Sequence, residues 1–175
     1  TSHTWHEVGQ ILRVVNDLEV KTFIELGTHV GGLASIVSCV QRYRDFYFYG
    51  VEKDSSIVSE KLLCPVYFGD IFDQKMIDML GSLMQGRTMI YCDDGDKIQE
   101  MRTYCSILRP GDIIACHDYF DGQYVDGLDG FGIDDSCGCV PEVRREDLLF
   151  IDGISFSKLP QYLLRGTRIM GFIRQ

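Results

Sequence analysis

Hydrophobic residues occur along the chain in two spacings, one typical of helices and the other typical of buried strands. Between His6 and Leu18 they recur every three or four positions, which predicts a helix with one face packed on a core. Segment 22–26 (Thr-Phe-Ile-Glu-Leu) is short and mostly apolar, as expected of a strand buried on both faces. The same patterns predict further strands at 46–51, 66–68, 87–92, 112–116, 155–159 and 167–173, and further helices at 33–41, 57–63, 74–84, 97–108 and 143–149.

Strands and helices alternate along most of the chain, and this order predicts the fold class. Parallel strands need a long crossover connection, usually a helix, so the alternation indicates an α/β fold with a mostly parallel, seven-stranded sheet and helices on both faces. The strands at 155–159 and 167–173 are expected to form an antiparallel pair joined near Gly166. Segment 118–136 is rich in Asp, Gly and aromatic residues without periodicity, which predicts a long loop.

Length and charge narrow the classes of function. The 175 residues predict a single domain over 1–175, since roughly 150 residues per domain is usual. A formal net charge of −9 without a basic stripe argues against nucleic acid as a partner. No apolar run approaches the roughly 20 residues that span a bilayer, and the first residues do not have the pattern of a signal peptide, so no membrane partner is expected. These observations predict a protein that binds small molecules.

The seven cysteines are predicted to be reduced thiols. Their number is odd, and most lie in apolar segments such as 89–92, where free thiols behave as small hydrophobic side chains. Cys137 and Cys139 form a close pair, but zinc sites usually need a second pair or regularly spaced histidines, and neither follows. Reduced thiols favour a cytoplasmic location.

A glycine-rich turn follows the first predicted strand, at the edge where ligands of open parallel sheets bind. Segment 25–32 reads Glu-Leu-Gly-Thr-His-Val-Gly-Gly, and its glycines allow a sharp turn and close approach of a ligand to the backbone. The N-terminus of the following helix favours an anionic group. A dinucleotide-binding fingerprint would need glycine in place of His29, and a P-loop would need Lys and then Ser or Thr after the last glycine. Neither motif is present.

Acidic residues follow the second and third predicted strands. Glu52 lies 25 residues after Gly27, where a carboxylate can accept both hydroxyls of a ribose, and a solvated cap is the alternative interpretation. Asp70 could accept a hydrogen bond from an adenine amino group, with Ile71 or Phe72 against the ring. The Gly-Asp pair at this point is also common in ordinary turns.

An acidic cluster follows the fourth predicted strand, and His117 and Asp118 follow the fifth. Segment 92–97 reads Cys-Asp-Asp-Gly-Asp-Lys, and neighbouring strand ends would bring these groups together. Crowded carboxylates repel each other unless a cation or a proton lies among them. An oxygen-rich set of this kind suits Mg²⁺. Capping of the following helix explains some of the Asp residues, but three in one turn opposite a His-Asp pair exceed that need.

In this order, these features resemble those of class I S-adenosylmethionine (SAM)-dependent methyltransferases over roughly residues 23–119. The family signature Glu-x-Gly-x-x-x-Gly is met at 25–31, in the loop that wraps the amino-acid part of the cofactor. Glu52 stands where the family has its ribose-binding acid, and Asp70 where it has its adenine-contacting acid. The resemblance implies a Rossmann-like, doubly wound sheet. It also implies a set of cofactor-binding residues: Glu25, Gly27, Thr28, His29, Gly31, Glu52, Asp70, Ile71 and Asp93.

Segments 90–97 and 108–114 resemble one branch of that family. This branch contains small-molecule O-methyltransferases similar to macrocin and catechol methyltransferases, together with cephalosporin-hydroxylase-like relatives. The resemblance implies that Asp94 and Asp118 bind a metal, expected to be Mg²⁺, and that Asp93 or Asp96 assists them.

Two residues beside the predicted metal site bear on the proton transfer. Lys97 is placed like the lysine that serves as the base in catechol-type enzymes. His117 departs from the family pattern, because an acidic residue usually precedes the one at Asp118. A lysine needs a lowered pKa to act as a base, whereas a histidine titrates near neutrality without help, and the sequence leaves both open.

The reaction expected from these residues is methyl transfer from SAM to a small-molecule acceptor, with a hydroxyl oxygen as the expected nucleophile. Asp94 would act through the metal, which lowers the pKa of the hydroxyl, and Lys97 or His117 would remove its proton. The alternative is a SAM-binding protein without methyltransferase activity, such as a regulatory or hydroxylase-associated domain. The sequence does not show the extra N-terminal helices that often cover the substrate in this family. The acceptor pocket is therefore expected to depend on the 118–136 loop or on a second subunit of a homodimer.

Overall fold

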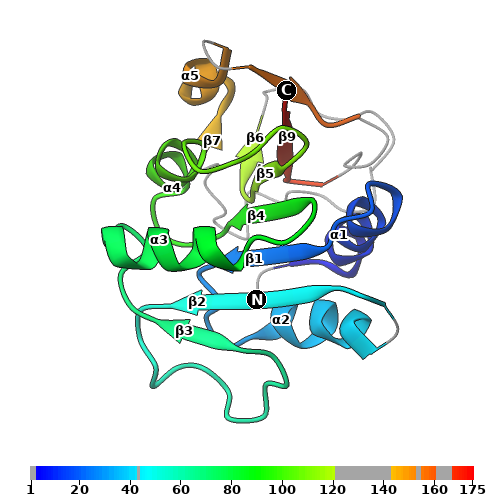
Figure 1. Ribbon diagram of the computed structural model, residues 1–175, viewed down its shortest axis with the longest axis vertical. Helices are drawn as coiled ribbons and strands as arrows, with labels where there is room; N and C mark the ends of the chain where they lie inside the picture. The colour runs from blue at the N-terminus through cyan, green and yellow to red at the C-terminus, as the bar shows by residue number, and fades with distance from the viewer. Residues whose placement is uncertain (1–2, 43, 121–142, 153–154, 161–166) are drawn as a thin grey trace, which may run out of the picture.

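A computed structural model describes residues 3–42, 44–120, 143–152, 155–160 and 167–175. Its centre is a seven-stranded sheet in the order β3-β2-β1-β4-β5-β9-β8 (Figure 1). The strands β3, β2, β1, β4 and β5 run parallel, whereas β9 is antiparallel to both β5 and β8. The bounds are β1 (Thr22–Leu26), β2 (Tyr47–Glu52), β3 (Val66–Phe68), β4 (Thr88–Cys92), β5 (Ile113–Cys116), β8 (Phe156–Lys158) and β9 (Met170–Arg174).

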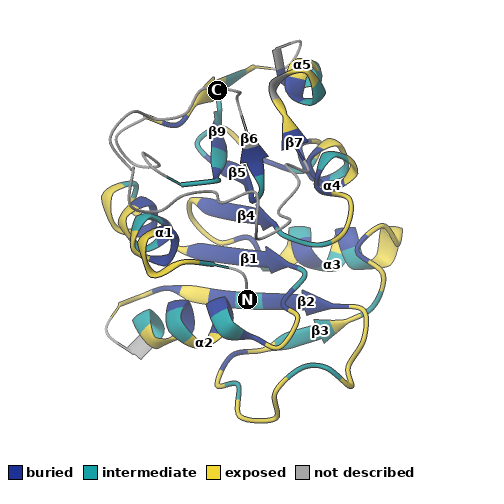
Figure 2. Ribbon diagram, turned by 180° about the vertical axis from the view of Figure 1, so that it is seen from behind, coloured by how far each residue is buried: buried dark blue, intermediate teal, exposed yellow. Residues whose placement is uncertain are grey.

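The central strand β1 explains how the sheet is buried on both faces. All of its residues are buried, and β1 pairs with β2 on one side and β4 on the other (Figure 2). Successive side chains of a strand point to opposite faces. Ile24 and Leu26 accordingly belong to one hydrophobic cluster, and Phe23 belongs to a second cluster on the opposite face.

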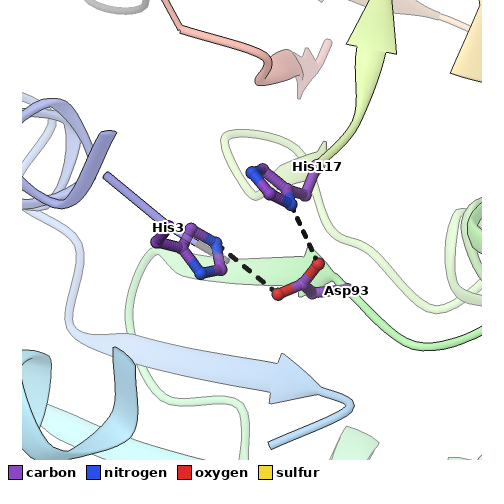
Figure 3. A group of neighbouring side chains, drawn as sticks. All are labelled: His3, Asp93 and His117. Atoms are coloured by element: carbon purple, nitrogen blue, oxygen red, sulfur yellow. Dashed lines mark ion pairs between the residues drawn. The ribbon is translucent and has the colours of Figure 1, made fainter. Parts of the chain in front are cut away.

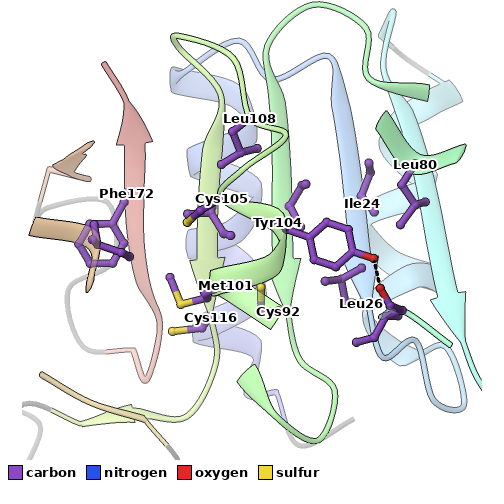
Figure 4. Close-up of a cluster of buried hydrophobic side chains, with 14 of the residues drawn as sticks. Ile24, Leu26, Leu80, Cys92, Met101, Tyr104, Cys105, Leu108, Cys116 and Phe172 are labelled. Carbon is purple, nitrogen blue, oxygen red and sulfur yellow. Dashed lines mark hydrogen bonds between the residues drawn. The ribbon is translucent and has the colours of Figure 1, made fainter. Parts of the chain in front are cut away.

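Helices cover each of the two clusters. On one face lie α1 (Trp5–Asp17) and α2 (Gly32–Val37), which is continued by the 3₁₀ turn η1 (Ser38–Arg42). On the other face lie α3 (Gln74–Leu83) and α4 (Lys97–Tyr104), and Figure 4 shows side chains from both helices packed against β1 and β4. The sheet covered by helices on both sides confirms the predicted Rossmann-like fold class. Among the described residues, no helix is long and apolar enough to cross a membrane.

Several predicted elements differ from the structure. The helix expected at 57–63 is wrong, because this segment consists of turns. Asp54 accepts hydrogen bonds from both the backbone N–H and the hydroxyl of Ser56, and Ser59 accepts one from the N–H of Lys61. Such local bonds between side chains and backbone compete with helix formation.

The segment expected as a helix at 143–149 begins instead with a short strand. It consists of β7 (Val143–Arg144), the 3₁₀ turn η3 (Arg145–Leu148) and α5 (Leu149–Asp152). The strand β7 pairs with β6 (Tyr119–Phe120) in a second, two-stranded sheet that the sequence pattern did not indicate. The antiparallel pair of β8 and β9 is confirmed, whereas the joint near Gly166, most of the predicted 118–136 loop and the Cys137–Cys139 pair lie outside the described residues. All five cysteines that the structure describes are free thiols, and four of them are buried.

Candidate active site

The turn after β1 requires a glycine at its first position. Gly27 has a φ of +83°, and a Cβ there would lie 2.7 Å from the carbonyl oxygen of Asp93 and from the backbone of Asp94. The turns after β1 and β4 therefore pack backbone against backbone. The N–H groups of Gly27 and Thr28 both donate to the carbonyl of Val51, each at 3.0 Å, which ties the turn to the end of β2.

Glu25 is a carboxyl group buried at this turn. Burial raises the pKa of Glu25 well above its ordinary value, and the nearby charge of Asp93 adds to the effect. Its Oε2 atom and the hydroxyl of Thr28 are both buried without a hydrogen-bond partner among the residues described. A buried carboxyl with an unused oxygen is a feature that a cationic ligand group would satisfy.

Glu52, at the end of β2, organises the neighbouring loops. Its Oε2 accepts a hydrogen bond from the backbone N–H of His29 at 2.7 Å, and its Oε1 accepts from the N–H groups of Lys53 at 2.8 Å and Asp54 at 3.1 Å. A carboxylate has about four lone-pair sites, so these three bonds leave acceptor capacity on Oε2 for a hydroxyl group.

Asp70 follows β3 and lies on the same rim as Glu52. The backbone N–H of Gly69 donates to the carbonyl of Glu52 at 3.1 Å, and Lys53 Nζ lies 3.3 Å from Asp70 Oδ2. The N–H of Phe72 and the ammonium of Lys53 lower the pKa of Asp70. Ile71 is buried next to it, and its carbonyl accepts a hydrogen bond of 2.7 Å from the hydroxyl of Tyr104, drawn in Figure 4. The three segments predicted to bind the cofactor, which follow β1, β2 and β3, therefore lie next to one another.

His117, directly after β5, is fully buried among carboxylates. Its Nδ1 lies 3.2 Å from Asp93 Oδ1 and 3.3 Å from Asp118 Oδ1, and its Nε2 lies 3.4 Å from Glu7 Oε1. Burial alone would lower the pKa of His117, but the carboxylates of Asp118, Asp93 and Glu7 raise it to about 10.

Lys97 connects the turns after β4 and β5. Its buried Nζ donates to the carbonyl of Asp94 at 2.9 Å and lies 3.6 Å from Asp118 Oδ2. Of the two adjacent aspartates after β4, Asp93 approaches His117. Asp94 is half-buried beside Glu100, and burial raises the pKa of Asp94. The roles predicted for Asp94, Asp118 and Lys97 stay predictions.

Three residues of this cluster were missed by the sequence interpretation because they come from segments near the ends of the chain. The ring of His3 stacks on that of His117 with centroids 4.3 Å apart, as Figure 3 shows. Glu7 lies in the first turn of α1, and Arg168 precedes β9, with its Nε 3.2 Å from Glu7 Oε1 and its NH1 3.0 Å from Asp118 Oδ1. The only local signal was the Thr4-x-x-Glu7 capping box, which indicates a helix start rather than a site.

Comparison with known proteins identifies the fold. No family model matches the chain, and the search of curated proteins found no match. CmcI, solved with Mg and SAM, has a TM-score of 0.67 at 14% identity over 97% of this chain and 70% of CmcI. A protein from Staphylococcus aureus described as a caffeoyl-CoA O-methyltransferase has a TM-score of 0.65 at 11% identity, over 100% and 86% of the two chains.

A third solved structure with the same fold is MycE, a methyltransferase of the mycinamycin biosynthetic pathway. It was solved in complex with Mg, S-adenosylhomocysteine (SAH) and mycinamycin VI, and it has a TM-score of 0.56 at 16% identity. The alignment covers 94% of this chain and 48% of MycE. The chain therefore has the fold of class I SAM-dependent O-methyltransferases.

Proposed function

We propose that this protein transfers a methyl group from SAM to a hydroxyl oxygen of a small molecule. The observation that carries the proposal is Glu25, a buried carboxyl with an unused oxygen at the Gly27 turn, on the same sheet edge as Glu52 and as the cluster around His117. The same fold carries SAM in CmcI and SAH in MycE.

The cofactor would lie across the ends of β1, β2 and β3. The turn 27–31, together with Glu25, would hold the amino-acid part of SAM, and its ammonium group would satisfy the oxygen of the buried carboxyl that lacks a partner. Glu52 would accept hydrogen bonds from the ribose hydroxyls. Asp70 would accept one from the adenine amino group, with Ile71 against the ring.

The protein's contribution to the reaction is mainly one of positioning. Methyl transfer is an in-line displacement at an already activated sulfonium, and correct placement of donor and acceptor can lower the barrier by about 7 to 11 kcal/mol. A divalent cation bound beside Asp93 and Asp118 would polarise the acceptor hydroxyl. Asp94 remains a proposed ligand of that cation.

Lys97 is the better candidate for the base. His117 is enclosed by three carboxylates that raise its pKa to about 10, so it carries a proton at neutral pH. Lys97 comes from the first turn of α4 and lies within 3.6 Å of Asp118 at the same edge. The neutral form of Lys97 would be placed to receive the proton of a hydroxyl held near Asp118, and a divalent cation at this edge would favour that form over the ammonium.

A second candidate function is SAM binding without methyl transfer. It is favoured by the ion pairs of Asp118, whose carboxylate lies 3.0 Å from Arg168 NH1 and 3.6 Å from Lys97 Nζ. These two cations compensate Asp118 without any metal. Such a protein would bind SAM and would form no methylated product.

Calorimetry followed by a turnover assay tests the proposal. We expect micromolar binding of SAM and SAH and no binding of NAD, and then product formation with a panel of catechols and sugar hydroxyls. Absence of binding to either methionine cofactor would refute both candidate functions. Binding without product for any acceptor would favour the second.

Two variants distinguish the residues proposed to bind the cofactor from those proposed to bind the metal. Glu52→Ala is expected to weaken SAH binding by about 10- to 100-fold, since hydrogen bonds to charged groups contribute about 1.5–3 kcal/mol. Asp94→Ala is expected to reduce turnover far more than SAH affinity. Glu60→Ala, which removes an exposed carboxylate, serves as the control. Equal losses of affinity and turnover in both variants would show that the cofactor-binding and metal-binding roles are misassigned.

A further inference from the structure

We propose that the buried cluster of His3, Asp93 and His117 binds a first-row divalent transition metal of the zinc type and discriminates against Mg²⁺. The inference goes beyond the proposed methyl transfer, and it is tested by metal binding alone. It depends on the positions of three side chains that the sequence places far apart and the fold brings together.

The three donors converge from three different segments. His3 precedes α1, Asp93 follows β4 and His117 follows β5, and one ligand atom of each lies within 4.8 Å of the other two. The carboxylate of Asp93 lies to one side of the two stacked rings and faces a nitrogen of each, with Oδ1 3.2 Å from His117 Nδ1 and Oδ2 3.5 Å from His3 Nε2 (Figure 3). Two ligands that are each about 2.1 Å from one ion are about 3.0 Å apart at a right angle and about 3.4 Å apart at a tetrahedral angle. The two separations from Asp93 fall close to these values, and they involve different oxygens of its carboxylate.

Unsatisfied nitrogens provide an independent indication of an ion. The side chain of His117 is fully buried, and its Nδ1 atom, which faces Asp93, has no hydrogen-bond partner among the described residues. The side chain of His3 is also fully buried, and its Nε2 atom, which faces Asp93, lies 2.8 Å from the hydroxyl of Tyr91, whereas its Nδ1 atom has no hydrogen-bond partner among the described residues. His117 Nδ1 faces the carboxylates of Asp93 and Asp118 without the angles of a hydrogen bond. A buried polar atom without a partner needs an explanation, and a coordinated cation supplies one. Because the surrounding carboxylates keep His117 protonated at neutral pH, an ion bound at Nδ1 would have to displace that proton.

The surroundings of His117 have the features that orient a metal-binding histidine. Metal ligands of this type usually direct their second ring nitrogen toward a carboxylate, which fixes the ring. His117 Nε2 lies 3.4 Å from Glu7 Oε1. Glu7 is itself held by the N–H groups of Thr4 and Arg168, and its carboxylate cannot swing away without breaking the cap of α1. The same contact directs Nδ1 of His117 toward Asp93.

The donor types decide between metals. Imidazole nitrogen suits Zn²⁺, Co²⁺, Fe²⁺ and Ni²⁺, whereas Mg²⁺ binds almost only oxygen and keeps several waters. A set of ligands made only of oxygen atoms is not available at this site. His117 lies between Asp93 and Asp118, and Asp118 is already paired with Arg168 Nη1 at 3.0 Å. Two histidines and one carboxylate leave open coordination positions, as in catalytic rather than structural zinc sites.

Metal titrations of the chelator-treated protein, without SAM, test the inference. In calorimetry we expect one Zn²⁺ or Co²⁺ per chain and an affinity for Zn²⁺ at least 100-fold higher than for Mg²⁺. The visible spectrum of the Co²⁺ protein should show d–d bands of nitrogen and oxygen ligation. A thiolate-to-cobalt charge-transfer band would place the ion on cysteines instead and would overturn the proposal, as would equal affinities for Zn²⁺ and Mg²⁺.

Variants then locate the ion. His3→Gln and His117→Asp are each expected to weaken Zn²⁺ binding by at least 10-fold, and His117→Asp should also raise the affinity for Mg²⁺ by supplying an oxygen. His6→Gln, which changes an exposed histidine of α1, should leave both affinities unchanged. Thermal unfolding of each apo variant checks that it is folded.

The variant results can contradict the inference separately from the proposed function. If His3→Gln and His117→Asp bind Zn²⁺ as tightly as His6→Gln does, the assigned site is wrong. SAM binding in the absence of any transition-metal binding would refute this inference while leaving the methyl-transfer proposal standing. Transition-metal binding in the absence of SAM binding would refute the methyl-transfer proposal and leave this inference standing.

Discussion

Glu100, on α4, is a buried carboxyl whose ionisation should weaken the fold. It is fully buried, its Oε2 accepts a hydrogen bond of 3.4 Å from the N–H of Asp94, and its Oε1 has no partner among the described residues. Burial, reinforced by the charge of Asp94, raises the pKa of Glu100 from its ordinary 4.5 to about 8. We predict that Glu100→Gln, which keeps the shape of the neutral acid, removes a pH-dependent loss of stability.

The size and sign of the effect follow from proton linkage. Below pH 4.5 the folded and unfolded states both hold the proton, so Glu100 does not oppose folding there. Between 4.5 and 8 the unfolded state has released its proton and the folded state has not, so the free energy of unfolding falls by about 1.4 kcal/mol per pH unit. The loss attributable to Glu100 is about 3 kcal/mol at pH 7 and reaches its full value of about 5 kcal/mol above pH 8.

Urea denaturation followed by circular dichroism measures this difference. Glu100→Gln should match the unsubstituted protein at about pH 4 and exceed its free energy of unfolding by a margin that grows up to about pH 8. Glu60→Gln, at an exposed position, should track the unsubstituted protein throughout. A stabilisation by Glu100→Gln that is constant with pH, or a loss of stability at pH 9, would refute the reasoning.

Two further predictions concern stability. Gly27→Ala should lower the free energy of unfolding by about 1–3 kcal/mol, because the residue has a φ of +83° and its Cβ would meet backbone atoms at 2.7 Å. Gly9→Ala, at a helical position with open space around it, should raise the free energy of unfolding by about 1 kcal/mol. Thermal unfolding measures both variants, and equal stabilities of Gly27→Ala and Gly9→Ala would contradict the prediction. Asp112→Ala should cost about 3–5 kcal/mol in urea denaturation, because the buried carboxylate accepts hydrogen bonds from the N–H of Thr88 at 2.8 Å and from Arg109 at 2.9 Å. A loss below 1 kcal/mol would show that water replaces the carboxylate.

The sequence by itself determined the fold class and the order of the chemical groups along one edge of the sheet. Strands β1 and β3 have the predicted bounds. All residues of β1 are buried, and a strand buried on both faces is a short apolar run that can be recognised from the local sequence. Parallel strands place their carboxyl ends at one edge, so residues that follow strands, such as Glu52 and Asp118, could be assigned to a common site in advance.

Local signals failed where two local structures have similar free energies. The segment 57–63 has helical spacing, yet it forms turns, in which Asp54 and Ser59 accept hydrogen bonds from the N–H groups of Ser56 and Lys61. The strand β7 is only two residues long and exists through its pairing with β6, so no periodicity could show it.

Only the tertiary structure decided how the cluster around His117 is built. Arg168 and Glu7 are 161 positions apart, and nothing local in either segment indicates that they meet. The choice between Asp93 and Asp94 is also tertiary, because a hydrogen bond of 3.0 Å from the N–H of Asp93 to the carbonyl of Leu26 sets the turn after β4, and that turn directs Asp93 toward His117. Hydrophobic patterning is a property of neighbouring residues, whereas the charge around a buried histidine depends on which distant segments the fold brings against it.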